Sequence, residues 1–244
     1  MAIFDRKSVL RHKQLDRKEK FATRANIRDA ILGFQDGAVN TLGLVLGVAG
    51  AVASNNIVLI SGLVTTFAES ISMAAVAYTS TKAAREFYEG KRKKEIMEMK
   101  EVPEIEEDEI RQIYHRKGFR GKQLEGIVKK IISNKRRWLK VMMEEELRLF
   151  PEDYDKPGKS AILVGVSAVI GSLIPIIPFF FLTVKNGMIA ALGASVAALF
   201  LVGVVKARMT EMNWKKSGLE LAIIGTLAAL VGFGIGKLLG GIYG

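Results

Sequence analysis

The sequence predicts an all-α membrane protein: a five-helix transmembrane bundle with a helical insert between the second and third spans. Of its 244 residues, 49% are hydrophobic and 25% are charged. The two kinds of residue are segregated, because charge is nearly absent from residues 29–80 and 160–205 and gathers in the N-terminal arm and in residues 82–159. Such segregation predicts that one set of segments lies in lipid and the other in water.

Five apolar stretches are long enough to cross a bilayer, since its hydrocarbon core of roughly 30 Å needs about 20 helical residues. Pro175 and Pro178 are expected to kink the third stretch, because proline lacks an amide donor and clashes with the preceding turn. The bend is either structural or shapes a cavity. Glycines recur in the first and last stretches and predict close helix packing. The five stretches are 29–52, 57–79, 161–182, 188–205 and 219–239.

The loops predict the orientation. The N-terminal arm, the insert and the turn holding Arg208, Lys215 and Lys216 are basic, whereas the connections at 54–56 and 185–187 carry almost no charge. The positive-inside rule therefore places the N-terminus and the insert in the cytoplasm and the C-terminus outside. The arm lacks the apolar core and the cleavage site of a signal peptide. The net charge of +11 follows from this topology and from anionic lipid head groups, so no nucleic-acid partner is expected.

The resulting organisation has four parts. Residues 1–28 form a basic cytoplasmic arm, and residues 29–81 form the first two transmembrane helices. Residues 82–159 form a cytoplasmic helical domain, in which the second span continues as one long helix, and residues 160–244 form the last three transmembrane helices. Further helices are expected after Pro103, near 122–132 and near 135–149, with a turn at Gly118.

Two carboxylates fall inside the predicted spans. Inserting an ionised side chain at the centre of a membrane helix costs at least about 2.5 to 3.5 kcal/mol of free energy. Asp36 lies in the first span with Asn40 one turn further on, and Glu69 lies in the second between Thr65 and Met73. This spacing places acid, amide, hydroxyl and thioether groups along two helix faces and suggests cation or proton handling. Alternatively, Asp36 caps or pairs near the interface, and Glu69 is protonated within the bundle.

The predicted helices of the insert carry paired glutamates. Glutamates three apart share a helix face, and oxygen ligands with a thioether suit a divalent cation. The alternative is a solvated charge run held by i,i+4 ion pairs. Glu107 and Asp108 extend the acidic cluster. The candidate metal ligands are Glu95, Glu98, Glu106, Glu109, Met142, Met143, Glu145 and Glu146.

Two other functional classes are alternatives to a metal carrier. A membrane-anchored ferritin-like protein that binds or oxidises iron is disfavoured, because the Glu-x-x-His pair is missing and His12 and His115 have no ligand-like partner nearby in sequence. A binding module or regulator anchored by its spans would have no use for Asp36 and Glu69 inside the membrane. The chain contains no cysteine, which excludes thiolate sites.

Several motifs occur together in one order. They are Gly33–Gly37 (GFQDG), Glu69–Met73 (ESISM), Val102–Glu104 (VPE), Trp138–Leu147 (WLKVMMEEEL) and Ile174–Pro178 (IPIIP). In this combination, over about residues 25–240, the chain resembles the insert-bearing members of the vacuolar iron transporter family.

The resemblance implies a homodimer of five-span protomers that exports ferrous iron from the cytosol in exchange for protons and is not an enzyme. It implies that Asp36 and Met73 line the transport path and that the candidate ligands of the insert form a metal-binding domain. From their spacing on the same two helices, Glu69 and Asn40 are expected to line this path as well. Ferrous iron would be both substrate and bound ion, with manganese and other divalent cations possible. A plasma membrane in a prokaryote and a vacuolar membrane in a eukaryote both fit.

One position departs from the family pattern. Plant and fungal members carry a glutamate two turns before the path methionine, whereas this chain has Thr65 there and its acid one turn nearer, at Glu69. One helical turn moves a carboxylate by about 5.4 Å, so Glu69 can still face the same path.

Overall fold

The computed structural model describes residues 6–52, 54–151, 154 and 156–243, with side chains described only between residues 25 and 242. This part of the chain contains helices and no strand, which confirms the all-α prediction. The helices are α1 (Arg6–Ala51), α2 (Asn55–Glu101), α3 (Pro103–Arg116), α4 (Gly121–Ile132), α5 (Lys135–Val141), the π-helix η1 (Met142–Glu146), α6 (Pro157–Ile176), α7 (Pro178–Phe181), α8 (Val184–Thr210) and α9 (Trp214–Tyr243).

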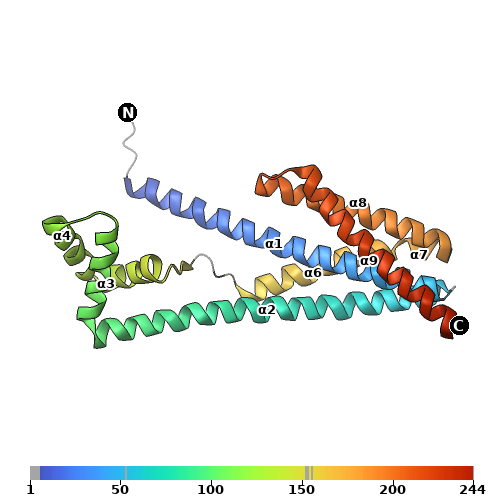
Figure 1. Ribbon diagram of the computed structural model, residues 1–244, viewed down its shortest axis with the longest axis horizontal. Coiled ribbons are helices and arrows are strands. Elements are labelled where there is room, and N and C mark those ends of the chain that lie inside the picture. Colours follow the sequence, from blue (N-terminus) through green and yellow to red (C-terminus); the bar gives the residue numbers. More distant parts are fainter. Residues whose placement is uncertain (1–5, 53, 152–153, 155, 244) are drawn as a thin grey trace. The chain divides into compact units, whose positions relative to one another are not determined.

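Five helical stretches are long and apolar enough to cross a membrane, as the sequence predicts. Four of them are residues 25–51, 157–181, 184–210 and 214–242, and the fifth is the apolar part of α2. α2 runs without a break from Asn55 to Glu101, so the second span continues into the insert as expected (Figure 1). α1 is also longer than its span. The side chains of the basic arm, His12 included, lie outside the described residues.

The third span is interrupted at the predicted prolines. α6 ends at Ile176 and the short α7 begins at Pro178, with Phe179 almost fully buried. The side-chain amide of Asn55, at the start of α2, donates to the carbonyl oxygens of Leu182 (2.6 Å) and Phe179 (3.3 Å). These bonds satisfy carbonyls that the helix end leaves free and join the start of α2 to the end of α7.

The described chain divides into two compact units, Thr23–Thr79 with Pro157–Gly244 and Met1–Ala22 with Ser80–Lys156. In the first, the membrane unit, α8 and α9 lie side by side (Figure 1). α1 approaches its neighbours through glycines: a Cβ at Gly236 of α9 would lie 1.8 Å from the carbonyl oxygen of Gly47, and one at Gly33 would lie 2.2 Å from that of Val164 in α6. No side chain larger than glycine fits these crossings as they stand, which confirms the predicted close packing.

The second unit, the insert unit, has its own small hydrophobic core. Ile110 of α3, Val128 of α4, Trp138 of α5 and Met142 of η1 are buried against one another. α4 is clearly amphipathic, with Leu124, Val128 and Ile131 on its buried face. The expected turn at Gly118 is present, at a φ of +99° that favours glycine. This core fixes α3, α4 and α5 relative to one another within the unit.

Candidate functional site

Two polar regions contain the residues singled out by the sequence, one in each unit. The membrane region, here called the polar lane, comprises Asp36 and Asn40 of α1 and Glu69 and Met73 of α2. The amide of Asn40 donates a hydrogen bond to Oε1 of Glu69, and the carboxyl of Asp36 lies close enough to interact electrostatically with Glu69. Met73 lies one turn further along α2 and is partly buried. The structure therefore brings the two carboxyls and the amide together.

The polar lane has an unused ligand atom. Oε2 of Glu69 is buried and has no hydrogen-bond partner within the described part of the chain. A buried oxygen without a partner is costly, and a second carboxyl beside it adds repulsion when both are ionised. A cation or protons between Asp36 and Glu69 would remove both penalties. The lane also lies near the surface of the membrane unit, because Asn40 is exposed and the neighbouring Phe67 and Ile71 of α2 are 60% and 70% exposed.

The second region is an acidic pocket of about 140 Å³ in the insert unit. Glu95 and Glu98 extend from one face of α2, Glu106 and Glu109 from one face of α3, and Glu146 from the end of η1. Five carboxylates from three separate helices therefore converge, as the repeated pairs in the sequence predict. The alternative of a merely solvated charge run does not describe this pocket, because Glu95 and Glu106 are only 4% and 5% exposed.

Burial and mutual repulsion dominate the electrostatics of the acidic pocket. The pKa of Glu95 is raised to about 8, first by burial and then by the adjoining Glu106 carboxyl. The pKa of Glu146 is raised to about 7, again first by burial and then by the charges of Glu109 and Glu106, and burial also raises the pKa of Glu106. Without a metal, the pocket therefore retains protons near neutral pH.

Each of the three most buried acids keeps an unused oxygen. Oε1 of Glu95, Oε2 of Glu106 and Oε2 of Glu146 are buried and lack a hydrogen-bond partner in the part of the chain that the structure describes. Hard divalent cations prefer such oxygen ligands. Within the described residues, however, no three acid or histidine groups already surround one point as a metal cage does. An ion in this pocket would have to draw the carboxylates toward itself.

The winding of the chain after α5 explains why Glu146 faces the pocket. Residues Met142–Glu146 form a π-helix, in which the amide of Leu147 bonds to the carbonyl oxygen of Met142 at 3.1 Å. The predicted helix near 135–149 thus ends earlier, and Arg148 follows with a φ of +54°. A π-turn inserts an extra residue and shifts the faces of the residues that follow, which is common at functional sites.

Three predicted ligands are placed elsewhere. Met142 is fully buried in the hydrophobic core of the insert unit, against residues such as Trp138. Met143 is 3% exposed and does not line the acidic pocket. Glu145 forms an ion pair with Lys117. Their role as ligands stays a prediction, and the pocket itself is built from glutamates.

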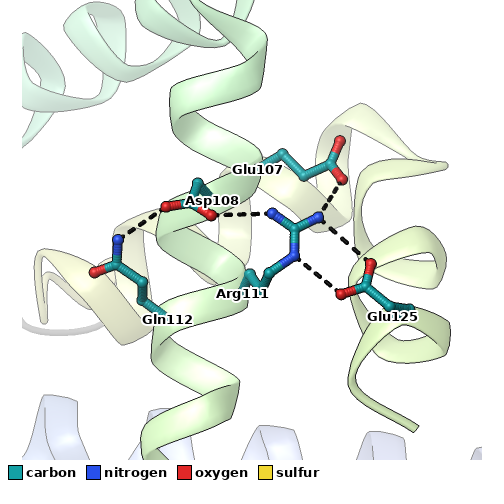
Figure 2. A network of polar contacts seen from close by, with 5 residues as sticks. All are labelled: Glu107, Asp108, Arg111, Gln112 and Glu125. Atoms are coloured by element: carbon teal, nitrogen blue, oxygen red, sulfur yellow. Dashed lines mark hydrogen bonds and ion pairs between the residues drawn. The ribbon is translucent and has the colours of Figure 1, made fainter. Parts of the chain in front are cut away.

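Glu107 and Asp108 also turn away from the acidic pocket. The guanidinium of Arg111 bonds to Glu107 of the same helix at 2.9 Å, to Asp108 at 3.0 Å and to Glu125 of α4 at 3.0 Å (Figure 2). Gln112 donates a further bond to Asp108. This network joins α3 to α4 and leaves Glu106 and Glu109, on the other face of α3, free for the pocket.

Sequence reasoning missed residues in both regions. Lys91 and Lys94 line the acidic pocket, on the same face of α2 as its glutamates. Each precedes a pocket glutamate by four residues, Lys91 before Glu95 and Lys94 before Glu98, and this spacing is the signal that identifies them. In the membrane unit, Asp29 is buried and accepts hydrogen bonds from Arg28 and Ser160, which ties α1 to α6 near one end of the span. The sequence offers no signal for the bond to Ser160.

Comparison with known proteins gives extensive matches. The family model described as the VIT family matches residues 27–237. Vacuolar iron transporter 1 of Oryza sativa subsp. japonica is 34% identical over 212 residues, which cover 86% of this chain and 84% of the relative. Vacuolar iron transporter 1 of Arabidopsis thaliana is 30% identical, covering 87% and 85%. The vacuolar iron transporter of Plasmodium falciparum is 29% identical, covering 88% and 82%.

Proposed function

This chain belongs to the VIT family, and on that premise we propose that it transports divalent metal ions, ferrous iron first, across a membrane. The observation that carries the proposal is the match to relatives named vacuolar iron transporters, which covers most of both chains. The polar lane and the acidic pocket support it independently, because each offers buried carboxylate oxygens without partners. Enzymatic oxidation of iron is not part of the proposal: among the described residues, no histidine lines the pocket.

The polar lane is the proposed transport path. An ion passing between α1 and α2 is held by Asp36 and Glu69, with Asn40 orienting Glu69 and Met73 offering a soft sulfur one turn away. Carboxylates suit a path of this kind because protonation weakens their hold on a metal. We therefore propose antiport, in which protons replace the departing ion and ferrous iron leaves the cytosol. Manganese fits the same ligands.

The acidic pocket is the proposed collecting site. Five carboxylates attract cations to the insert and raise their local concentration. Its glutamates Glu95, Glu98, Glu106, Glu109 and Glu146 are the ligands that the geometry supports best. We propose that this pocket lies on the cytoplasmic side, where an exporter must capture its substrate, and the positive-inside pattern of the loops supports this.

A homodimer completes the proposal. Asn40 of the polar lane is exposed, and the lane is flanked by exposed apolar residues of α2 such as Phe67 and Ile71. Polar groups that face hydrocarbon without partners are unfavourable, so a second copy over this face would enclose the lane. Depending on the organism, the membrane is vacuolar or the plasma membrane.

Metal flux into liposomes tests the proposal. The purified full chain is reconstituted with a metal-sensitive dye inside, and Fe²⁺ or Mn²⁺ is added outside under reducing conditions. We expect the dye signal to change at a rate that scales with protein content. Asp36→Asn together with Glu69→Gln serves as the matched control, since both changes keep side-chain shape. Equal flux in this control and in the unaltered protein would overturn the proposed path.

A further inference from the structure

The acidic pocket contains cations of its own. Lys91, Lys94, Glu95 and Glu98 occupy one stripe of α2, at spacings of three, four and seven residues. Nζ of Lys94 lies 2.8 Å from Oε1 of Glu98, so one pocket carboxylate already holds an ammonium group. The charges of Glu95 and Glu106 also act on this ammonium.

The other lysines nearby do not share this placement. The ammonium of Lys91 lies over the ring of Phe87, 5.7 Å from its centre. Lys93 is exposed and does not line the pocket. Lys94 is thus the pocket lysine for which the structure gives an ion pair with a pocket carboxylate, and its side chain is 60% exposed, which leaves it room to move into solvent.

An incoming divalent ion and the ammonium of Lys94 compete for the charge of one carboxylate, that of Glu98. A metal bound at Glu98 repels the ammonium at close range and thereby weakens its ion pair with Glu98. Either cation reduces the repulsion among the five carboxylates. The two are therefore alternative partners of the Glu98 carboxylate.

We infer that Lys94 is the resident counter-cation of the acidic pocket, leaving Glu98 when a divalent ion binds and returning when the ion departs. The inference rests on the proposed metal-binding role of the insert. As a consequence, the pocket binds divalent ions less tightly than it would without Lys94. A bound ion is released readily, because the Glu98 carboxylate regains Lys94 as its partner when the ion leaves. Such tuning suits a site that passes its ion onward rather than storing it.

Mn²⁺ binding to the full-length protein, followed through the electron paramagnetic resonance signal of free Mn²⁺, tests the inference. Lys94→Met removes the competing charge and keeps a long, flexible side chain. Lys93→Met removes an equal charge from the next residue and is the matched control. We expect Lys94→Met to bind Mn²⁺ roughly three to five times more tightly than Lys93→Met, a modest factor because exposed ion pairs are weak. Lys94→Arg keeps the ion pair and should bind as the unaltered protein does.

Amine acylation of the unaltered protein, read by mass spectrometry, measures the displacement itself. Lys94 should be acylated faster when Mn²⁺ is added, while the rate for Lys93 stays constant. Equal Mn²⁺ affinity in Lys94→Met and Lys93→Met, or an acylation rate of Lys94 that Mn²⁺ does not change, would overturn the inference. The double variant Glu95→Gln, Glu106→Gln shows which part of the measured Mn²⁺ binding belongs to the acidic pocket, because it removes two pocket carboxylates. If that double variant binds Mn²⁺ as the unaltered protein does, the collecting role of the insert is overturned, and the inference with it.

Discussion

The polar lane and the acidic pocket use the same chemical group under different constraints. In the lane, two carboxyls and one amide lie on α1 and α2, and glycines pack α1 closely against α6 and α9. In the pocket, five carboxyls of a small domain converge, and Lys91 and Lys94 share the lining with them. The lane thus offers few ligands, and they lie on closely packed helices. The pocket offers many ligands, and its glutamate side chains can rearrange around an ion.

This difference suggests a division of labour. A path needs each ligand, because removing one of two acids leaves the other without a partner in a region where water is scarce. A collecting site can lose a ligand and keep part of its function, because the remaining carboxylates still attract cations. Substitutions in the two regions should therefore differ in size and in what they affect.

The largest expected effect belongs to the polar lane. Asp36→Asn should lower metal flux in liposomes by about 100-fold, since even weakening the support of a metal ligand costs 10- to 100-fold. Mn²⁺ binding to the acidic pocket should be unaffected. If Asp36→Asn transports metal within twofold of the unaltered protein, at equal reconstituted amounts, Asp36 is not part of the path. The contrast drawn between the lane and the pocket would then be wrong.

Substitution in the acidic pocket should act on binding more than on maximal flux. Glu95→Gln with Glu106→Gln is expected to weaken Mn²⁺ binding by roughly tenfold, because two buried ligands lose their charge. Flux at saturating metal should fall by much less. Glu86→Gln, an exposed change on the same helix that breaks an ion pair with Lys82, is the control and should alter neither quantity.

The pH dependence of Mn²⁺ binding follows from the raised acids. Glu95 and Glu146 hold protons up to a pKa of about 8 and about 7, and a metal must displace those protons. Affinity should therefore be highest above pH 8 and fall by at least about tenfold toward pH 6. Titration in matched buffers measures this, and an affinity that stays constant across the range would show that these acids are not ligands.

As pH rises, the same raised pKa values lower the stability of the metal-free protein, whereas metal binding becomes tighter. In the metal-free protein, Glu95 and Glu146 bind protons more tightly when folded than when unfolded, so their contribution to stability is complete below about pH 4.5 and is lost as pH rises toward 8. Bound metal offsets this loss. Thermal unfolding of the insert at pH 8 should consequently shift upward when Mn²⁺ is added.

Glycine substitutions should have the smallest effect on metal handling, because they change helix packing and remove no ligand. Gly236→Ala places a Cβ 1.8 Å from the carbonyl oxygen of Gly47 and should destabilise the membrane unit by about 1–3 kcal/mol. Gly126→Ala in α4 meets no atom within 4 Å and should stabilise the insert slightly, because alanine favours a helix over glycine. The melting temperatures of the two variants are measured in detergent. Gly234→Ala is the control within α9, because its added Cβ also meets no atom within 4 Å.

Much of the fold was predictable because its causes are local in sequence. Apolar length defined the five spans, Pro178 marked the break in the third, and Pro103 marked the start of α3. The spacing of Asp36 and Asn40 placed them on one face, and the same rule paired Glu95 with Glu98. These inferences needed only helical periodicity and the cost of charge in lipid.

The remaining features depend on contacts between segments distant in sequence. The π-helix is one, since Met142 is buried in a core shared with α3 and α4. The partner of Glu145 is Lys117, and Arg111 rather than the pocket holds Asp108. A charge run shows that ion pairs will form, but only the packed helices determine which carboxylates face inward.

The most direct test of the proposed transport mechanism is simultaneous recording of iron and pH in proteoliposomes with an acidic lumen. Addition of Fe²⁺ outside should produce iron entry and a matching rise in luminal pH, and Asp36→Asn should abolish both signals. Iron entry with no change in luminal pH would contradict proton antiport, and iron binding with no entry would contradict transport altogether.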